Sequence, residues 1–157
     1  MVGMKKDHQS YRKVQIKNKR ARFEYHLKDS FNAGLVLTGS EIKSIRLGKA
    51  NLQDAYCVFD GEELWIQGMH ISPYEQGSYY NHEPTRKRKL LLNKNELRKL
   101  IKISKDSGTT IIPTRLFIND RGLAKMEIAV ARGKKLYDKR DDIRKKDEQR
   151  EIGRSGF

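Results

Sequence analysis

The sequence predicts a mainly β fold: an antiparallel barrel of about six strands with two or three short helices, followed by a basic C-terminal tail. Three observations predict it. Short segments of strand-like alternation are separated by turn residues at close intervals. Two other segments have helix-capping residues at their ends. The last 26 residues, Arg132 to Phe157, hold ten Lys or Arg, six Asp or Glu and only five apolar side chains, too few to build a core.

The positive charge of the chain is large and unevenly distributed. Lys and Arg number 34 against 20 Asp and Glu, which gives a formal net charge of +14. Residues 1–22 carry eight basic side chains and one acid, and residues 86–105 carry nine and one. Residues 50–85 carry six acids and no Lys or Arg. This segregation predicts a basic side that docks on phosphates, as expected of a nucleic-acid-binding protein.

The N-terminal segment, residues 1–13, lacks periodicity and is expected to be a flexible basic arm. It contains no apolar signal-peptide core, and no apolar run in the chain approaches the length of a membrane span. We therefore expect a cytoplasmic protein that does not bind membranes. The single cysteine, Cys57, excludes an internal disulfide and a multi-cysteine zinc site, and its place in a predicted strand indicates a core residue.

The strands are predicted from alternation and from turns. A first strand is expected from Arg22, where apolar and polar side chains alternate as far as Leu27. A turn at Asp29-Ser30 is then expected to lead into a returning strand at residues 35–37. Two β-hairpins are predicted further on, one from residues 55–59 and 64–66 around Asp60-Gly61, the other from residues 109–118 and 123–131 around a turn at 119–122.

The two helices are predicted from their ends, because each begins with a capping box and is followed by a glycine. The residues are Thr38, Glu41 and Gly48 for the first helix and Asn93, Glu96 and Gly108 for the second. Between them, Gly68 to Pro84 forms a long polar loop with three tyrosines, Tyr74, Tyr79 and Tyr80. These tyrosines either stack on bases or pack the loop onto the barrel.

Together these elements fit a Greek-key barrel of the oligonucleotide-binding (OB) type over residues 14–131, with a two-layer α+β sheet as the alternative. Residues 132–157 form the tail, which we expect to be disordered when free. Asp141 and Asp142 each precede a lysine by four residues, a spacing that stabilises helices, so the tail can fold on a polyanion. A merely solubilising extension is the alternative interpretation.

No pattern in the sequence predicts catalysis. The four histidines are scattered without metal-binding spacing, and neither a nucleophile elbow nor the aspartate cluster of a two-metal nuclease is present. We therefore expect a protein that is not an enzyme and needs no metal or cofactor. The residue types of an RNA-binding surface are present instead. Basic residues 19–22 directly precede the aromatic Phe23 and Tyr25, and a second basic run covers residues 86–89.

Five blocks of the sequence resemble the SsrA-binding protein (SmpB) family. In order along nearly the whole chain, they are Asn18–Tyr25 (NKRARFEY), Gly39–Arg46 (GSEIKSIR), Gly48–Leu52 (GKANL), Arg88–Leu92 (RKLLL) and Gly133–Arg140 (GKKLYDKR). The resemblance implies an OB-type barrel that binds the tRNA-like domain of transfer-messenger RNA (tmRNA, or SsrA RNA). It also implies delivery of that RNA to stalled ribosomes for trans-translation. We expect a monomer in the absence of these partners.

The resemblance also implies which residues touch the RNA. These are Tyr25, Leu91 and Asn93, with Lys19, Arg20, Arg22, Arg86 and Arg88 as phosphate partners. Asn32 stands beside Ala33-Gly34 at a position where family members often have Glu. Asn keeps a carbonyl acceptor but loses the negative charge, so the resemblance leaves open whether Asn32 preserves the contact of that Glu.

In the tail, the resemblance implies residues that enter the empty mRNA channel of the ribosome and fold as a helix. They are Gly133, Lys134, Lys135, Tyr137, Asp138, Lys139 and Arg140, with Tyr137 stacking on a base of the decoding centre. The implied mechanism is mimicry, in which barrel and RNA together replace a tRNA and the tail senses that no message is present. The alternatives are a structural ribosomal protein, a generic OB-fold RNA binder and an RNA-processing enzyme.

Overall fold

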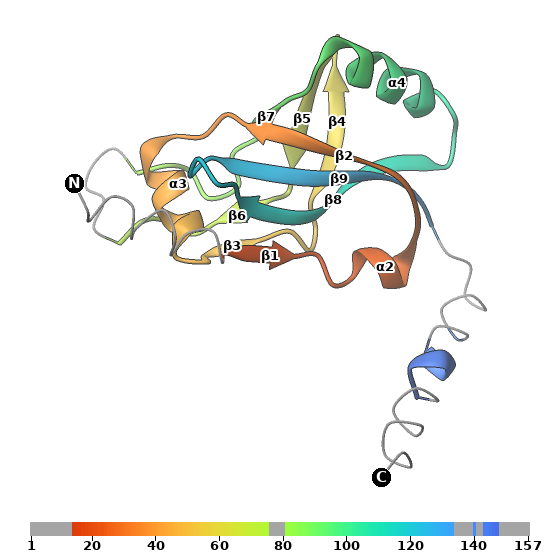
Figure 1. The fold of residues 1–157 in the computed structure, drawn as a ribbon, viewed down its shortest axis with the longest axis horizontal. Helices are drawn as coiled ribbons and strands as arrows, with labels where there is room; N and C mark the ends of the chain where they lie inside the picture. Colours follow the sequence, from red (N-terminus) through yellow and green to blue (C-terminus); the bar gives the residue numbers. More distant parts are fainter. Residues whose placement is uncertain (1–13, 76–80, 134–139, 141–142, 148–157) are drawn as a thin grey trace.

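The computed structural model describes residues 14–75, 81–133, 140 and 143–147 (Figure 1). Its described residues up to Gly133 contain nine strands and three helices. The strands are β1 (Gln15–Lys17), β2 (Tyr25–Leu35), β3 (Ala50–Asn51), β4 (Tyr56–Asp60), β5 (Glu63–Gln67), β6 (His70–Ile71), β7 (Arg88–Leu91), β8 (Thr109–Ile118) and β9 (Ala124–Gly133). The helices are α2 (Ala21–Glu24), α3 (Gly39–Arg46) and α4 (Lys94–Ser104). The arm expected at residues 1–13 lies outside the described residues.

Six of the described strands close into a barrel. The ring runs β2, β9, β8, β4, β5, β7 and back to β2, and every pairing is antiparallel. The predicted mainly β, antiparallel fold is therefore confirmed. The expected number of about six strands equals that of the ring, but the prediction counted residues 35–37 as a separate strand and did not include β7. It also missed three short strands outside the ring. Strand β1 extends the sheet beside β8, and β3 pairs with β6. Such short segments carry too few residues for an alternating pattern.

The helices occupy the connections between strands that are not neighbours in the ring. Helix α3 lies between β2 and β4 in the chain, and α4 connects β7 to β8. Tight turns join β4 to β5 and β8 to β9, whereas the neighbours β5 and β7 are joined by a long loop that contains β6. Both predicted capping boxes are present, at Thr38 with Glu41 and at Asn93 with Glu96. Gly48 follows the first helix with a φ of 74°. In the part of the chain that the structure covers, no helix is long and apolar enough to cross a membrane.

The core fills the inside of this barrel. In β9, Met126 and Ile128 are fully buried and face the interior together with Leu64 and Ile66 of β5. Cys57 is also buried. Burial raises the pKa of its thiol, so the side chain stays neutral and fills the core as predicted.

The strand predicted from Arg22 is wrong in its first three residues, because residues 22–24 belong to helix α2. Ala21 of α2 is buried in a small second cluster with Ile112 and Ala131 on the outside of the barrel. This packing outweighs the local alternation of apolar and polar residues.

The turn predicted at Asp29-Ser30 is also wrong. Strand β2 continues through it, and the register against β9 shifts between Lys28 and Ser30, as in a β-bulge. Asp29 has a φ of 21°, a conformation that Asp tolerates better than most residues. Residues up to Leu35 therefore prolong one long strand instead of returning as a second one.

The barrel extends slightly further than expected towards the tail. Strand β9 includes Arg132 and Gly133, which pair with His26 and Tyr25 of β2. Beyond it, residues 143–147 have helical backbone and exposed side chains, and they lie apart from the barrel in Figure 1. The remaining tail residues lie outside the described part of the chain.

Candidate nucleic-acid interface

Helix α2 stands beside two hollows in the surface of the described residues. The larger has a volume of about 470 Å³ and the other of about 360 Å³. They share Asn18 and Ala21. The first is lined by Gln15, Lys17, Asn18, Lys19, Ala21, Arg22, Thr114, Arg115 and Glu127, and the second includes Arg20, Tyr25, Gln53 and Tyr56. We call these two hollows together the α2 cleft.

Asn18 fixes the entry to helix α2. Its Nδ2 donates to the carbonyl oxygens of Pro113 at 2.9 Å and Leu52 at 3.3 Å, and its backbone N–H donates to Thr114 O at 2.9 Å. The chain is thus tied to β8 immediately before the basic residues. Because Asn18 is buried and hydrogen-bonded, the backbone that carries the following basic residues is held in one position.

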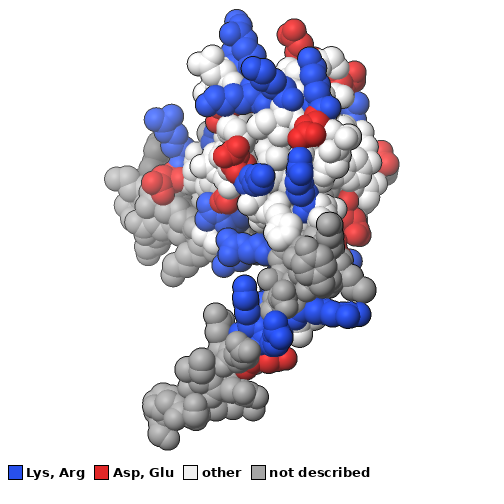
Figure 2. Space-filling model, turned by 90° about the vertical axis from the view of Figure 1, so that its right-hand side faces the viewer, with Lys and Arg blue, Asp and Glu red and all other residues white. Residues whose placement is uncertain are grey.

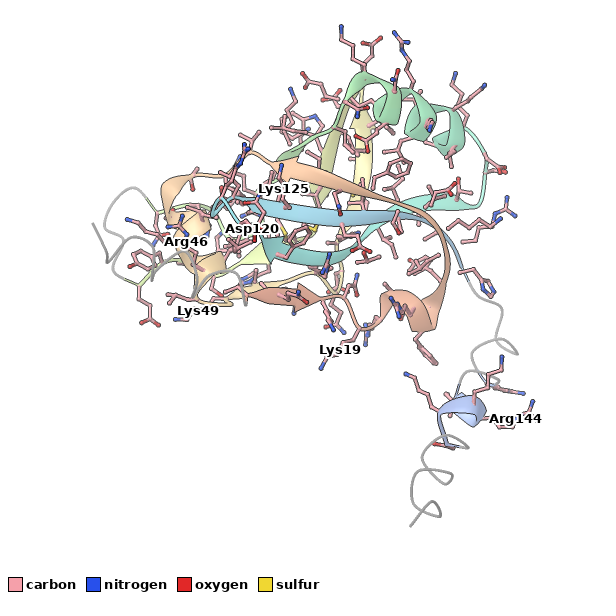
Figure 3. All side chains as sticks on the ribbon, in the orientation of Figure 1. Lys19, Arg46, Lys49, Asp120, Lys125 and Arg144 are labelled. Atoms are coloured by element: carbon pink, nitrogen blue, oxygen red, sulfur yellow. The ribbon has the colours of Figure 1, made fainter. Side chains whose placement is uncertain are left out.

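The predicted phosphate partners Lys19, Arg20 and Arg22 are all exposed around this cleft. Lys19 lies at the lower edge of the barrel in Figure 3. Arg20 is oriented by Gln53, whose side-chain oxygen, with the amide in its favourable orientation, accepts from Arg20 Nε at 2.7 Å. Tyr25, at the end of α2, is half-buried against the small cluster beneath the helix and also lines the cleft. The structure therefore brings these four predicted residues together.

A second group of predicted residues lies on the outer face of the barrel. Asn32 on β2 is exposed, with Glu127 of β9 opposite it in the register. Leu91 on β7 is 50% exposed and pairs with Gly34. A Cβ at Gly34 would lie 3.4 Å from Leu91 Cβ. The lack of a side chain at Gly34 therefore leaves space beside the exposed Leu91. Lys125 pairs with Gly34 from the other side.

Asn93 is exposed next to this face, but its side-chain oxygen is already engaged. Oδ1 accepts from the backbone N–H of Glu96 at 2.8 Å, which caps α4. Its Nδ2 group donates no hydrogen bond to the described residues and can serve a partner. The predicted capping role of Asn93 is thus confirmed, and the RNA contact that the resemblance implies has to be made by a side chain that also begins a helix.

Arg86 and Arg88 share one buried carboxylate, that of Glu41 in α3. Arg86 Nη2 donates to Glu41 Oε1 at 2.6 Å, and Arg88 Nε donates to Glu41 Oε2. Arg88 Nη1 and Nη2 also donate to the carbonyl oxygens of Met69 at 3.0 Å and Pro84 at 3.1 Å. The side chain of Arg88 is 0% exposed, whereas that of Arg86 is 35% exposed.

The expectation that Arg88 binds a phosphate is therefore corrected: its guanidinium is enclosed and holds α3, the long loop and β7 together. Arg86 keeps an exposed portion. Because two guanidinium groups share one carboxylate, the cluster retains one positive charge near the surface.

The electrostatics of Glu41 follow from these contacts. Burial by itself raises the pKa of this carboxyl group, but the hydrogen bonds from Arg86, Thr38 and Arg88 and the charge of Arg88 lower it from 4.5 to about 2. Burial lowers the pKa of Arg88, against the opposing effect of Glu41. The carboxylate is thus ionised at neutral pH.

Four residues of the outer face were not predicted: Arg115, Phe117, Lys125 and Glu127. The Arg115 guanidinium lies 4.3 Å from the centre of the Phe117 ring, and its Nη2 lies 3.2 Å from Glu127 Oε2. All four alternate with core residues on β8 and β9. Strand alternation therefore placed them outside, but only the pairing of β9 with β2 and with β8 brings them to the same face as Asn32.

The predicted tail residues are described only in part. Gly133 is exposed at the end of β9, and Arg140 is exposed and helical. The other predicted ones, Lys134, Lys135, Tyr137, Asp138 and Lys139, lie outside the described residues, as do Tyr79 and Tyr80 of the long loop. Tyr74 is described, and its ring centre lies 5.5 Å from Lys43 Nζ.

The described residues show no gathering of three His, Cys, Asp or Glu side chains able to hold a metal ion. His82 is buried, with Nδ1 at 2.8 Å from Ser40 Oγ and Nε2 at 2.9 Å from Ile71 O. Both ring nitrogens are therefore used to attach the long loop to α3 and β6. The arrangement of exposed basic and aromatic groups suits a polyanion, with phosphates on the basic side chains and bases on the ring faces.

Comparison with known proteins gave consistent matches. The family model described as SmpB protein matches residues 15–156. An SsrA-binding protein of Cytophaga hutchinsonii is 59% identical over 141 residues, covering 90% of this chain and 92% of that protein. One from Parabacteroides distasonis is 59% identical over 142 residues, covering 90% and 93%. A solved structure named "tmRNA-SmpB: a journey to the center of the bacterial ribosome" is similar with a TM-score of 0.67 and 42% identity, covering 78% of this chain and 86% of that one.

Proposed function

The chain belongs to the SmpB family, and on that basis we propose that it binds tmRNA through the tRNA-like domain and delivers it to stalled ribosomes in trans-translation. The relatives are named for binding SsrA RNA, and the similar solved structure places tmRNA and SmpB in the bacterial ribosome. The observation that carries the proposal is the α2 cleft, where exposed basic side chains surround a rigid, half-buried tyrosine.

In this proposal the barrel is the receptor for free RNA. Lys19, Arg20 and Arg22 bind phosphates, while Tyr25 offers a ring face to an unpaired base. The outer face around Leu91 contributes apolar contact, and Arg86 adds a charge at its margin. Asn32 accepts a hydrogen bond with its side-chain oxygen, and the neighbouring negative charge comes from Glu127 instead of from position 32.

The protein acts by mimicry and catalyses no reaction. Barrel and tRNA-like domain together take the place of a tRNA on the ribosome, and the protein works in the cytoplasm, where ribosomes are found. The tail then enters the empty mRNA channel. Its residues Gly133, Lys134, Lys135, Tyr137, Asp138, Lys139 and Arg140 contact the decoding centre. Since ten basic side chains lie from Arg132 onward, folding on ribosomal RNA neutralises the repulsion within the tail.

Truncation after Gly133 tests this division of labour. Strand β9 ends at Gly133, so the shortened chain keeps every pairing of the barrel. We expect it to bind a tRNA-like-domain transcript within about threefold of the full chain, allowing for loss of the tail's general charge. Rescue of ribosomes stalled on a truncated message, measured in a reconstituted translation reaction, should be lost.

A second variant serves as the control for this experiment. The full chain with Lys19→Gln, Arg20→Gln and Arg22→Gln should lose transcript binding and rescue together, because the receptor surface is removed and the tail is left intact. Equal loss of RNA binding in the truncated chain would refute the proposed separation. Unimpaired transcript binding by the triple variant would refute the assignment of the α2 cleft.

A further inference from the structure

The outward side of β4, β5 and β7 differs in charge from the basic surfaces of the molecule. Lys and Arg side chains are spread over the described surface drawn in Figure 2. On the outward side of these strands, by contrast, acids and bases balance. We call this surface the β5 face, and its side chains are Val58 and Asp60 of β4, Glu63, Trp65 and Gln67 of β5, Lys87 just before β7 and Lys89 within it.

Strand alternation turns the side chains of the β5 face away from the core. Their neighbours along the strands are buried in the barrel and are Cys57, Leu64, Ile66 and Leu90. The register places Val58 on one side of Trp65 and Lys89 on the other. It also places Asp60 opposite Glu63. The half-buried Val58 and Trp65 are therefore bordered by charged side chains.

The lysines of the β5 face are paired with its acids. Lys87 Nζ lies 3.7 Å from Asp60 Oδ2. Lys89 Nζ lies 3.1 Å from Glu63 Oε1. Glu62 adds an exposed negative charge at the turn between β4 and β5. In a chain of net charge +14, this part of the surface thus has no excess of positive charge to attract RNA.

Trp65 and Asp60 together hold the ammonium group of Lys87. Its Nζ lies 4.7 Å from the centre of the Trp65 ring, so the ring and the Asp60 carboxylate share one cation. The side chain of Lys87 is 44% exposed and that of Asp60 is 73% exposed. Exposed pairs of this kind are weak, so a cation from another molecule can replace Lys87 at little cost.

Trp65 also has an unsatisfied hydrogen-bond donor. Its Nε1–H is covered by protein atoms and has no acceptor among the described residues. A covered donor without an acceptor lowers stability, so the fold alone gives little reason for an indole at this place. Tryptophan is enriched at the centres of protein interfaces, because its large ring buries much area on binding.

The β5 face borders the α2 cleft without belonging to it. Tyr56 lines the second hollow of the cleft, and its hydroxyl donates to Gln67 Oε1 at 3.0 Å. In Figure 1, β4 and β5 rise towards α4, whereas α2 lies at the lower side of the barrel. A partner on the β5 face therefore uses different side chains from an RNA in the α2 cleft.

We propose that the β5 face is a docking site for a protein segment that carries Lys or Arg, whose cation takes the place of Lys87 between Trp65 and Asp60. Charge complementarity favours this partner, because the acids at the edge of the face attract cations and repel phosphates. The inference rests on the proposed function, since proteins of the ribosome are rich in Lys and Arg and offer such segments.

The first test changes the charge of the β5 face in the full-length protein. Asp60→Asn with Glu63→Gln removes two acids and leaves Trp65 in place. The matched control is Glu75→Gln with Asp120→Asn, which removes two exposed acids outside the face. Circular dichroism and thermal unfolding verify the fold of both variants. Their binding to vacant ribosomes and to the tRNA-like-domain transcript is measured at near-physiological salt.

For the β5 variant we expect ribosome affinity to fall about fivefold or more, although its positive charge is larger, because the partner's cation loses its carboxylate. Transcript affinity should stay within about twofold of wild type. The control variant should bind ribosomes as tightly as wild type or more tightly. Unchanged or tighter ribosome binding by the β5 variant, or a parallel loss of transcript affinity, would overturn the inference.

The second test identifies the class of the partner by cross-linking. Glu62→p-benzoylphenylalanine places a photoreactive group on the exposed turn beside the face, and Lys19→p-benzoylphenylalanine places one at the α2 cleft. Both full-length variants are irradiated in complex with tmRNA and ribosomes. Position 62 should give a product with a ribosomal protein that ribonuclease leaves intact, whereas position 19 should give a product with RNA.

Two cross-linking results would overturn the inference: a product with RNA at position 62, or no product there while position 19 reacts. Failure of the proposed function is recognised separately, because position 19 would then give no product with tmRNA. That result would remove the basis of the inference as well.

Discussion

At the scale of single residues, the side chain of Glu41 both caps a helix and compensates a buried positive charge. It completes the capping box of α3 and, although its side chain is fully buried, accepts from two arginines. A buried carboxylate is costly alone, but here it neutralises Arg88, which is equally buried. Loss of either partner would leave the other as an uncompensated buried charge, so the two side chains are needed together.

Glu41→Gln should therefore destabilise the protein by about 3–5 kcal/mol at pH 7, because Arg88 would keep its charge without a counterion. Denaturant unfolding of wild type and variant measures this difference. Glu75→Gln is the matched control, since Glu75 forms an exposed pair with Lys49 and should cost about 0–1 kcal/mol. An equally small effect of both changes would contradict the assigned role of Glu41.

The same carboxylate predicts a pH dependence. Its pKa in the folded protein is lowered from 4.5 to about 2, so the ionised form favours folding and its contribution is complete above about pH 4.5. That contribution, about 3 kcal/mol from the size of the shift, is lost as pH falls from about 4.5 to about 2. The stability difference between wild type and Glu41→Gln should shrink over this interval. A difference independent of pH between 5 and 2 would contradict the pKa assignment.

At the scale of elements, the chain between β5 and the start of β7 is attached at several points to α3 and to the residues just after α3. Ser40 contacts His82, Glu41 binds Arg86 and Arg88, and the backbone N–H of Ser72 donates to Lys49 O at 3.0 Å. The loop begins at Gly68, where a Cβ would lie 2.5 Å from the backbone oxygen of Asp54. The backbones of Gly68 and Asp54 therefore lie so close together that only glycine fits at position 68.

Gly68→Ala should destabilise the barrel by about 3 kcal/mol, since both a positive φ and a backbone clash oppose the methyl group. Gly61→Ala separates the two effects. Gly61 also has a positive φ, but nothing lies within 4 Å of its Cβ position, so this change should cost only about 1–2 kcal/mol. Denaturant midpoints of the two variants provide the comparison, and equal losses would show that the close approach to Asp54 carries no cost.

At the scale of the whole molecule, the net charge of +14 attracts any RNA, while the arrangement of the charge provides specificity. The basic residues of the α2 cleft, of helix α4 and of the tail arise from three separate stretches of the chain. The barrel holds the basic residues of the α2 cleft and of helix α4 at fixed positions around one core, and the tail follows its last strand. The proposed function uses this separation, because the barrel and the tail then bind RNA with different side chains.

The full chain should bind a tRNA-like-domain transcript and an RNA duplex of equal length with similar affinity at low salt. Raising the salt to about 0.15 M should weaken both, because counterion release dominates general binding. The transcript should then retain an advantage of at least about tenfold, since contacts to unpaired bases depend little on salt. Loss of that advantage would identify the protein as a generic basic RNA binder.

The sequence by itself determined those features that depend on residues close together along the chain. The capping boxes of α3 and α4 span four residues each, the core face of β9 follows from alternation, and the charge segregation is a matter of composition. The family was also recognisable, because its blocks consist of adjacent residues. For these features, neighbouring side chains supply the physical cause.

Only the tertiary structure decided the features that depend on distant partners. Arg88 is one of four consecutive basic residues, and its burial follows from Glu41, 47 positions earlier. Residues 22–24 alternate like a strand but form a helix because Ala21 packs on Ile112 and Ala131. Glu127 lies opposite Asn32 through the pairing of β2 with β9. Burial and cross-strand pairing are set by chain segments brought together on folding, which no local pattern encodes.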